Sequence, residues 1–220
     1  MARKKDDNGS LFDPPDGGAW DEKLGPLIEK YKAKAHPLQY KNLYQLIVMV
    51  VLSAQDADRH INEVAPPFFA AFPDFASIAK ASPKELQPYL RGVRNFAHKC
   101  EWLCKTAEKL GNGKISLKME DLTALDGIGR KSANVIRREM GESAEGIIVD
   151  LHVLRVVPRL GISQAKDATR MEKELMKAIS KPLWHHVGMC ISFLGRETCR
   201  PTNPKCGECV MNPHCAFTRP

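Results

Sequence analysis

The sequence predicts an all-α fold, and three observations lead to this prediction. From Trp20 onwards, apolar residues recur mostly at three- and four-residue spacing, as they do along one face of a helix. Several of these stretches end in glycine, as at Gly111, Gly141 and Gly161. Alternating β-branched runs bounded by hairpin turns are missing from the sequence, so we expect almost no strand.

The predicted helices can be placed in order along the chain. The first covers 20–31, and the second, 43–52, is apolar on nearly every face, which predicts a buried central helix. Ser82, Pro83 and Glu85 combine an N-cap, a proline at the first helical position and a capping box. Further helices are expected at 102–110, 121–125, 130–140, 152–160, 169–179 and 182–194, the last ended by Gly195.

One more helical stretch, 58–72, contains Pro66 and Pro67. Proline has no backbone N–H, and its ring clashes with the preceding turn of a helix. We therefore expect this helix to break or kink at the two prolines.

Charge and composition limit the class of protein. Lys and Arg (33) exceed Asp and Glu (26), and the net charge of +7 favours a polyanionic partner. Residues 1–18 are rich in charge, proline and glycine and contain no apolar run, which predicts a disordered tail and no secretory signal. The longest apolar segment, 46–52, is too short to cross a membrane. We expect an intracellular protein.

Four of the seven cysteines lie close together at the end of the chain, as Cys199, Cys206, Cys209 and Cys215, with the spacing C-x6-C-x2-C-x5-C. Without a secretory signal, disulfides are not expected, and four thiolates so close together predict a shared metal centre. Zinc remains an alternative, although zinc sites usually combine two C-x2–4-C pairs and only one is present. The other three cysteines follow no such pattern and are expected to be packed thiols.

The sequence L-D-G-I-G-R-K (125–131) joins two predicted helices. A bare Gly-x-Gly is more often only a tight turn. Here, however, Gly127 and Gly129 would let another backbone approach, and the helix that follows would offer unpaired N–H groups to a phosphate, beside Arg130. Lys131 follows directly; a helical lysine is ordinarily only solvated.

Four motifs, in order along residues 42–215, resemble the endonuclease III family of DNA glycosylases. They are L-S-A-Q-D-A-D (52–58), the glycine hairpin (usually L-P-G-V-G, with Asp126 in the proline's place), V-D-L-H (149–152) and the cysteine loop. The resemblance implies a helix-hairpin-helix lobe at 41–148 and a second lobe, 19–40 with 149–220, that holds a [4Fe–4S] cluster. It implies a monomer that binds damaged double-stranded DNA between the lobes, in the cytoplasm or nucleoid.

The resemblance also assigns roles to residues. Lys131 corresponds to the nucleophile that attacks the sugar, and Asp150 to the carboxylate that supports this attack, although Asp150 would also suit the N-cap of the next helix. We expect a hydrogen-bonding role near DNA for His152. Gln55 corresponds to the residue that fills the gap left by an extruded base, and Asp58 to one at the base pocket.

The stretch G-V-R-N-F-A-H-K (92–99) departs from the family, whose loop G-x-x-x-x-K-A reads about two residues shorter. We therefore expect a different wedge into DNA, with Arg94 or Phe96 at its tip.

The resemblance implies a bifunctional glycosylase that removes damaged bases, commonly oxidised pyrimidines, and cleaves the abasic site by β-elimination through a lysine Schiff base. Alternatives are a damage-binding protein with weak catalysis, a mismatch-specific glycosylase, which usually carries Tyr or Ser in place of Lys131, and a zinc-bound structural module.

Overall fold

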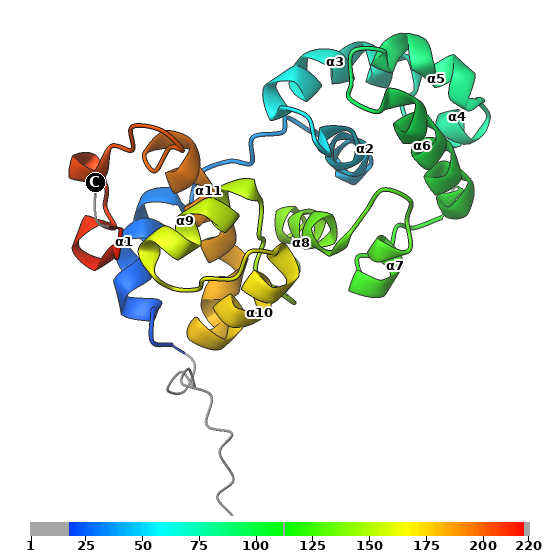
Figure 1. Cartoon of the computed structure of the whole chain (residues 1–220). Helices are drawn as coiled ribbons and strands as arrows, with labels where there is room; N and C mark the ends of the chain where they lie inside the picture. Colours follow the sequence, from blue (N-terminus) through cyan, green and yellow to red (C-terminus); the bar gives the residue numbers. More distant parts are fainter. Residues whose placement is uncertain (1–17, 112, 218–220) are drawn as a thin grey trace, which may run out of the picture. The chain divides into compact units, whose positions relative to one another are not determined.

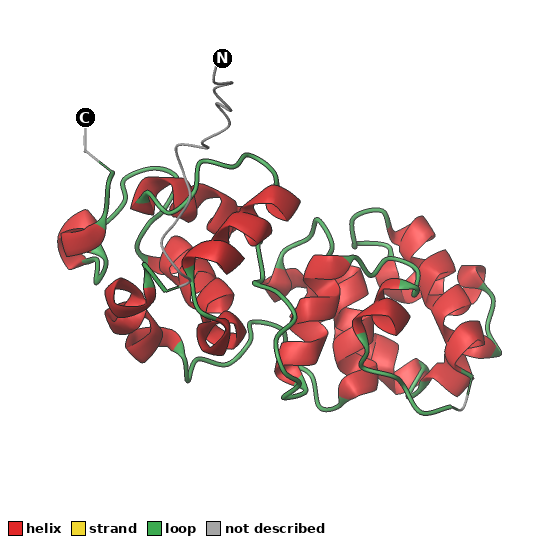
Figure 2. Cartoon of the chain, turned by 90° about the horizontal axis from the view of Figure 1, so that it is seen from below, coloured by secondary structure: helices red, strands yellow, loops and turns green. Residues whose placement is uncertain are grey.

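A computed structural model describes residues 18–111 and 113–217 (Figure 1). Within these residues the secondary structure is helical and contains no strand, which confirms the predicted fold class (Figure 2). Apart from Gly18, the predicted tail lies outside the described residues. No helix in the described chain combines the length and the apolar character that crossing a bilayer requires.

The chain divides into two compact units. The first, residues 33–148, contains α2 (Leu43–Ser53), α3 (Asp58–Ala71), α4 (Phe75–Ala79), α5 (Pro83–Leu90), α6 (Phe96–Leu110), α7 (Met119–Thr123) and α8 (Arg130–Glu139). The second unit combines the chain up to Lys32 with the chain from Val149 onwards. It contains α1 (Asp21–Tyr31), α9 (Leu151–Leu160), α10 (Ala168–Ala178) and α11 (Trp184–Glu197).

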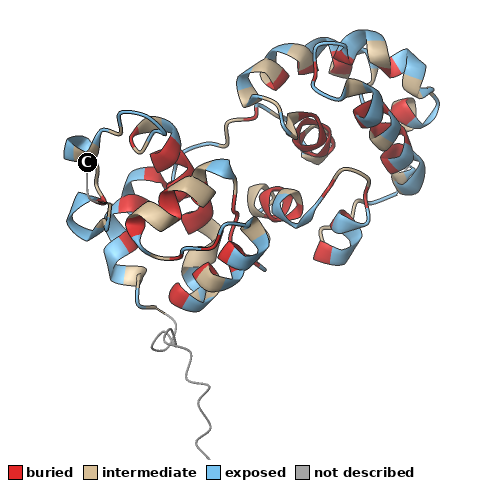
Figure 3. Ribbon diagram, viewed as in Figure 1, coloured by how far each residue is buried: buried red, intermediate tan, exposed pale blue. Residues whose placement is uncertain are grey.

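Helix α2 forms the core of the first unit. Its residues from Leu46 to Leu52 are all buried, and it packs against α3, α6 and α8. Figure 3 accordingly colours most of this helix as buried. Asn42 caps the start of the helix, and its side chain accepts a hydrogen bond from the N–H of Gln45 at 2.9 Å. The prediction of a buried central helix is therefore confirmed.

Of the break or kink expected at the two prolines, the break is contradicted, because α3 continues from Asp58 to Ala71 through both of them. Proline at positions 66 and 67 removes the N–H partners of the carbonyls of Asn62 and Glu63. Both of these residues reach solvent, so water can replace the missing donors. The buried face of α3, with Ile61, Ala65 and Phe68, holds the helix in place.

In the second unit, α11 packs against α1 and α9. The prediction that this helix ends at Gly195 is wrong, since α11 continues to Glu197. Gly195 is buried, and a Cβ atom built there would lie 2.9 Å from the Cβ of His152 in α9. The glycine thus permits close packing of two helices and does not end one. By contrast, Gly161 does end α9, with a φ of 89°.

Candidate functional site

The two glycines of the hairpin between α7 and α8 have different surroundings. Gly127 has a φ of 79°, and a Cβ atom there would lie 2.7 Å from the Trp102 ring of α6. Gly129 is the N-cap of α8 in an extended conformation, and a Cβ atom there would meet nothing within 4 Å. The fold therefore requires glycine at 127, whereas at 129 glycine leaves open space before the first N–H groups of α8.

The negative charge of Asp126 is compensated inside the hairpin. Lys109 of α6 places its Nζ 2.8 Å from the Asp126 carboxylate and also donates to the carbonyl of Ala124 at 2.9 Å. The hydrogen bond from Lys109 holds the pKa of Asp126 below its usual range. A phosphate that approaches the hairpin would thus meet an ion pair rather than a lone carboxylate.

Arg130 and Lys131 are the first two residues of α8, and both are exposed. The Arg130 guanidinium donates to the carbonyl of Glu145 at 3.0 Å. Lys131 therefore presents its amine to solvent from the first helical turn, directly after the open side of the hairpin.

Asp150 is the N-cap of α9, as predicted. Its Oδ1 accepts hydrogen bonds from the N–H groups of His152 (2.8 Å) and Val153 (2.9 Å). Its Oδ2 accepts a hydrogen bond from the Ser192 hydroxyl at 2.6 Å and lies 4.0 Å from the Arg196 guanidinium. Both carboxylate oxygens are thus held in place. Beside them, Nδ1 of His152 lies 3.2 Å from the Arg155 guanidinium.

The residues predicted to enter DNA lie in two turns of the first unit. Gln55, which follows α2, is exposed and has a left-handed φ of 60°. Arg94 is exposed in the turn before α6, and its backbone N–H donates to Oδ2 of Asp56 at 2.8 Å. This bond joins the two turns. Phe96 is half-buried as the first residue of α6, and Asp58 is half-buried as the first residue of α3.

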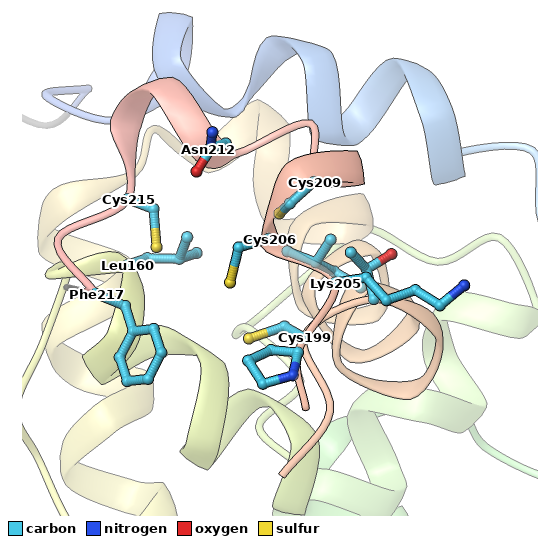
Figure 4. Close-up of a pocket in the computed structure, with 11 residues that line it drawn as sticks. Leu160, Cys199, Lys205, Cys206, Cys209, Asn212, Cys215 and Phe217 are labelled. Carbon is cyan, nitrogen blue, oxygen red and sulfur yellow. The ribbon is translucent and has the colours of Figure 1, made fainter. Parts of the chain in front are cut away.

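Four thiols line one pocket in the second unit, of about 440 Å³ when the space open to solvent is included (Figure 4). They belong to Cys199, Cys206, Cys209 and Cys215. In the described part of the chain, no three His, Cys, Asp or Glu residues are placed to hold a metal ion. The cysteines instead surround a common space. Four soft sulfur donors around one pocket fit an iron–sulfur cluster.

The remaining cysteines, Cys100, Cys104 and Cys190, are buried, as expected for packed thiols. Burial raises the pKa of the Cys100 thiol to about 11, and the neighbouring Cys104 adds to this effect. A thiol with such a pKa stays protonated at neutral pH and is a poor nucleophile.

Comparison with known proteins identifies the family. Residues 48–181, more than half of the chain, match the model of the HhH-GPD superfamily base excision DNA repair proteins. The chain belongs to this superfamily. It is 34% identical to endonuclease III of Synechocystis sp. over 188 residues, which cover 84% of this chain and 86% of the relative. The resemblance inferred from the four motifs is confirmed.

Two solved structures resemble this HhH-GPD protein over most of its length. One is a non-covalent complex of endonuclease III with DNA, with a TM-score of 0.80, 30% identity and coverage of 89% of this chain and 92% of that one. The other is a trapped covalent intermediate of endonuclease III with DNA, with a TM-score of 0.80, 30% identity and coverage of 89% and 93%.

Three residues near the predicted site were missed by the sequence reasoning. Lys99 is only 1% exposed, and its Nζ donates to the carbonyls of Leu52 and Ala54, each at 2.7 Å. Asp56 joins the two turns described above. His36 has its pKa lowered to about 4, mainly by burial, against the opposing effects of Glu139 and Asp58, while Lys131 lowers it slightly further. Asp56 and Lys99 lie within the stretches 52–58 and 92–99 singled out in the sequence, but the partners that define their roles, Arg94 and Leu52, lie far away along the chain. No motif marks His36.

Proposed function

We propose that this HhH-GPD protein is a bifunctional DNA glycosylase and AP lyase that acts on double-stranded DNA with damaged bases or abasic sites. The observation that carries the proposal is the placement of Lys131. Its amine is exposed in the first turn of α8, directly after a hairpin whose Gly129 side is open. Similarity to endonuclease III trapped in a covalent intermediate with DNA supports a covalent reaction, for which Lys131 would be the nucleophile.

The hairpin would bind the DNA backbone. The first N–H groups of α8 have no partner within the helix, and the helix dipole makes this end attractive to an anion. Arg130 adds a positive charge at the same end, and the pairing of Asp126 with Lys109 reduces the repulsion. A phosphate held here would bring the adjoining sugar towards Lys131.

In the proposed reaction, the Lys131 amine attacks C1′ of the damaged nucleotide, and the bond from C1′ to the base breaks. The attacking nitrogen gives one proton to the departing base. The C1′–O4′ bond then breaks, O4′ takes up a proton from solvent, and C1′ is left joined to the Lys131 nitrogen as a protonated Schiff base. Loss of a proton from C2′ then expels the 3′ phosphate and nicks the strand. Asp150 would stabilise the positive charge that develops on the sugar. Its carboxylate is suited to this because the α9 N–H groups and Ser192 fix its orientation.

We further propose that Cys199, Cys206, Cys209 and Cys215 hold a [4Fe–4S] cluster, as the donor set around their pocket allows. With the four cysteines as ligands, such a cluster would cross-link the loop, whose exposed Arg200 and Lys205 would be available to DNA. Iron and sulfide analysis together with absorption near roughly 400 nm tests the assignment against zinc. We place the protein in the cytoplasm or nucleoid, where its substrate lies.

Borohydride trapping tests the proposed nucleophile. We expect the parent protein to form a covalent complex with DNA that carries an abasic site, and Lys131→Ala to form none. Lys84→Ala is the matched control, because Lys84 is also an exposed lysine at the second position of a helix, α5. It should trap as the parent does. Trapping of Lys131→Ala at the parent's level would show that another amine reacts.

The preferred base is tested with duplexes that contain thymine glycol, dihydrouracil, uracil, mismatched thymine or an abasic site. We expect cleavage of the two oxidised or reduced pyrimidines. Cleavage of mismatched thymine alone would favour the mismatch-specific enzyme. Tight binding to abasic DNA without any cleavage would favour the damage-binding protein.

A further inference from the structure

The turn that carries Gln55 is held in a conformation that glutamine rarely adopts. Its φ of 60° lies in the left-handed region, yet its side chain is exposed and free to reach outward. A non-glycine residue persists in this region only where its surroundings determine the backbone. Two charged side chains make hydrogen bonds that hold this turn, those of Lys99 and Asp56.

Lys99 holds the turn through its side-chain amine. Its Nζ donates to the carbonyls of Leu52 and Ala54, both at 2.7 Å, at the end of α2 where helix carbonyls lack partners. The side chain comes from α6 and is almost fully buried. Burial lowers the pKa of Lys99, and Asp56 opposes this effect. A methionine would fill the same space at no electrostatic cost, so the buried amine points to a need for these two hydrogen bonds.

Asp56 fixes the same turn to the neighbouring loop. Its Oδ2 accepts the N–H of Arg94 at 2.8 Å, and its Oδ1 accepts the N–H of Ala57 at 2.8 Å and lies 2.9 Å from Nδ1 of His60. Burial raises the pKa of Asp56, but the hydrogen bonds from Arg94, His60 and Ala57 outweigh it and leave the pKa below its usual value. The carboxylate is thus ionised at neutral pH and satisfied on both oxygens.

We propose that Lys99 and Asp56 are positioning residues that hold Gln55 and Arg94 as one rigid element for entering damaged DNA. The inference rests on the proposed function, and it names the part of the protein that would hold the DNA duplex open once a base has been extruded. Extrusion requires unstacking, and a filler ordered in advance loses less conformational entropy on insertion than a flexible one. The two residues should therefore govern recognition of damage within a duplex and not the chemistry at Lys131.

The test compares affinities for two duplexes, an undamaged one and one that contains a tetrahydrofuran abasic analogue. We expect the parent to prefer the analogue and Lys99→Met to lose roughly tenfold of that preference, with binding to the undamaged duplex unchanged. Lys84→Met, which alters an exposed lysine of the same unit, should keep the full preference. Cleavage of abasic sites in single-stranded DNA, which needs no extrusion, should stay within about twofold of the parent for both variants.

If Lys99 had only a structural role, Lys99→Met would lower the preference for the abasic analogue, the cleavage of single-stranded DNA and the melting temperature together. Either that pattern or an unchanged preference for the analogue overturns the inference. If Lys99→Met does not fold, Asp56→Asn serves instead, because it keeps the side-chain size and removes the charge that joins the turns. Loss of duplex preference in a protein that never traps on DNA would leave the inference standing and overturn the proposed chemistry. A parent that binds both duplexes equally overturns both.

Discussion

At the scale of single residues, the two hairpin glycines have different roles: the fold requires Gly127, and the proposed phosphate ligand requires Gly129. Gly127→Ser should destabilise the protein by on the order of 2 kcal/mol, because a Cβ atom meets the Trp102 ring from a left-handed backbone. Gly129→Ser should leave stability unchanged, since serine is a good N-cap and the space is open. It should nevertheless weaken DNA binding, because the serine side chain would occupy the proposed phosphate site.

Thermal unfolding and DNA titration at two salt concentrations distinguish the two variants. A Gly129→Ser protein that binds DNA as tightly as the parent would rule out the hairpin as the phosphate site. Phosphate contacts release counterions, so the loss of one contact should also reduce the salt dependence of binding.

His36 should make stability depend on pH. Its pKa in the folded protein is about 4, against 6.5 for the free side chain, chiefly because of burial. As the pH falls from 6.5 towards 4, the unfolded chain therefore binds a proton that the folded protein does not. The free energy of unfolding should therefore decrease by about 3 kcal/mol as the pH falls through this window. Above pH 6.5 the protein should keep its full stability.

His36→Gln, which does not titrate, should remove most of this dependence. Urea unfolding at pH 7 and pH 4.5 measures the effect, with the surface variant His98→Gln as the control. Equal slopes with pH for parent and His36→Gln would show that other groups cause the acid sensitivity.

At the scale of helices, Gly195 and Gly25 form a contrasting pair. Gly195→Ala should cost about 1–3 kcal/mol, because its Cβ atom would lie 2.9 Å from the Cβ of His152 and push α9 and α11 apart. Gly25 is exposed in α1, and a Cβ atom there meets nothing within 4 Å beyond its chain neighbours. The helix preference of alanine would be opposed by the ring of Pro26, which crowds a Cβ atom on the preceding helical residue, so Gly25→Ala should change stability by less than about 1 kcal/mol. A melting temperature that falls clearly for Gly195→Ala and stays near that of the parent for Gly25→Ala would confirm the difference.

Gly195 and Gly161 show where sequence reasoning fails for helices. Periodicity placed α8 and α9 well, because each has an apolar face that repeats along the local chain, and a nearly continuous apolar run placed α2. A glycine can either end a helix or permit close packing inside one, however, and only its neighbours in space decide between these two roles. Gly161 ends a helix, whereas Gly195 lies inside one, where a second helix comes close.

At the scale of the whole molecule, motifs located the residues with proposed chemical roles but not those that position them. The four cysteines, Lys131 and Asp150 stand out because their types and spacing are unusual in sequence. Lys99 could not be found in this way, because its role depends on carbonyls of Leu52 and Ala54 that lie 47 and 45 residues away. A lysine in a helix looks solvated until the partners that bury it are known.

The pairing of α1 with α11 has a consequence for synthesis. Residues 33–148 form one compact unit, so all of its helices are available to pack once Ile148 has left the ribosome. The apolar face of α1, with Leu24, Leu27 and Tyr31, is made first but meets α11 only when the chain is nearly complete. The earliest helix is therefore the last to be buried, and a nascent chain stalled before Trp184 would expose this face to chaperones.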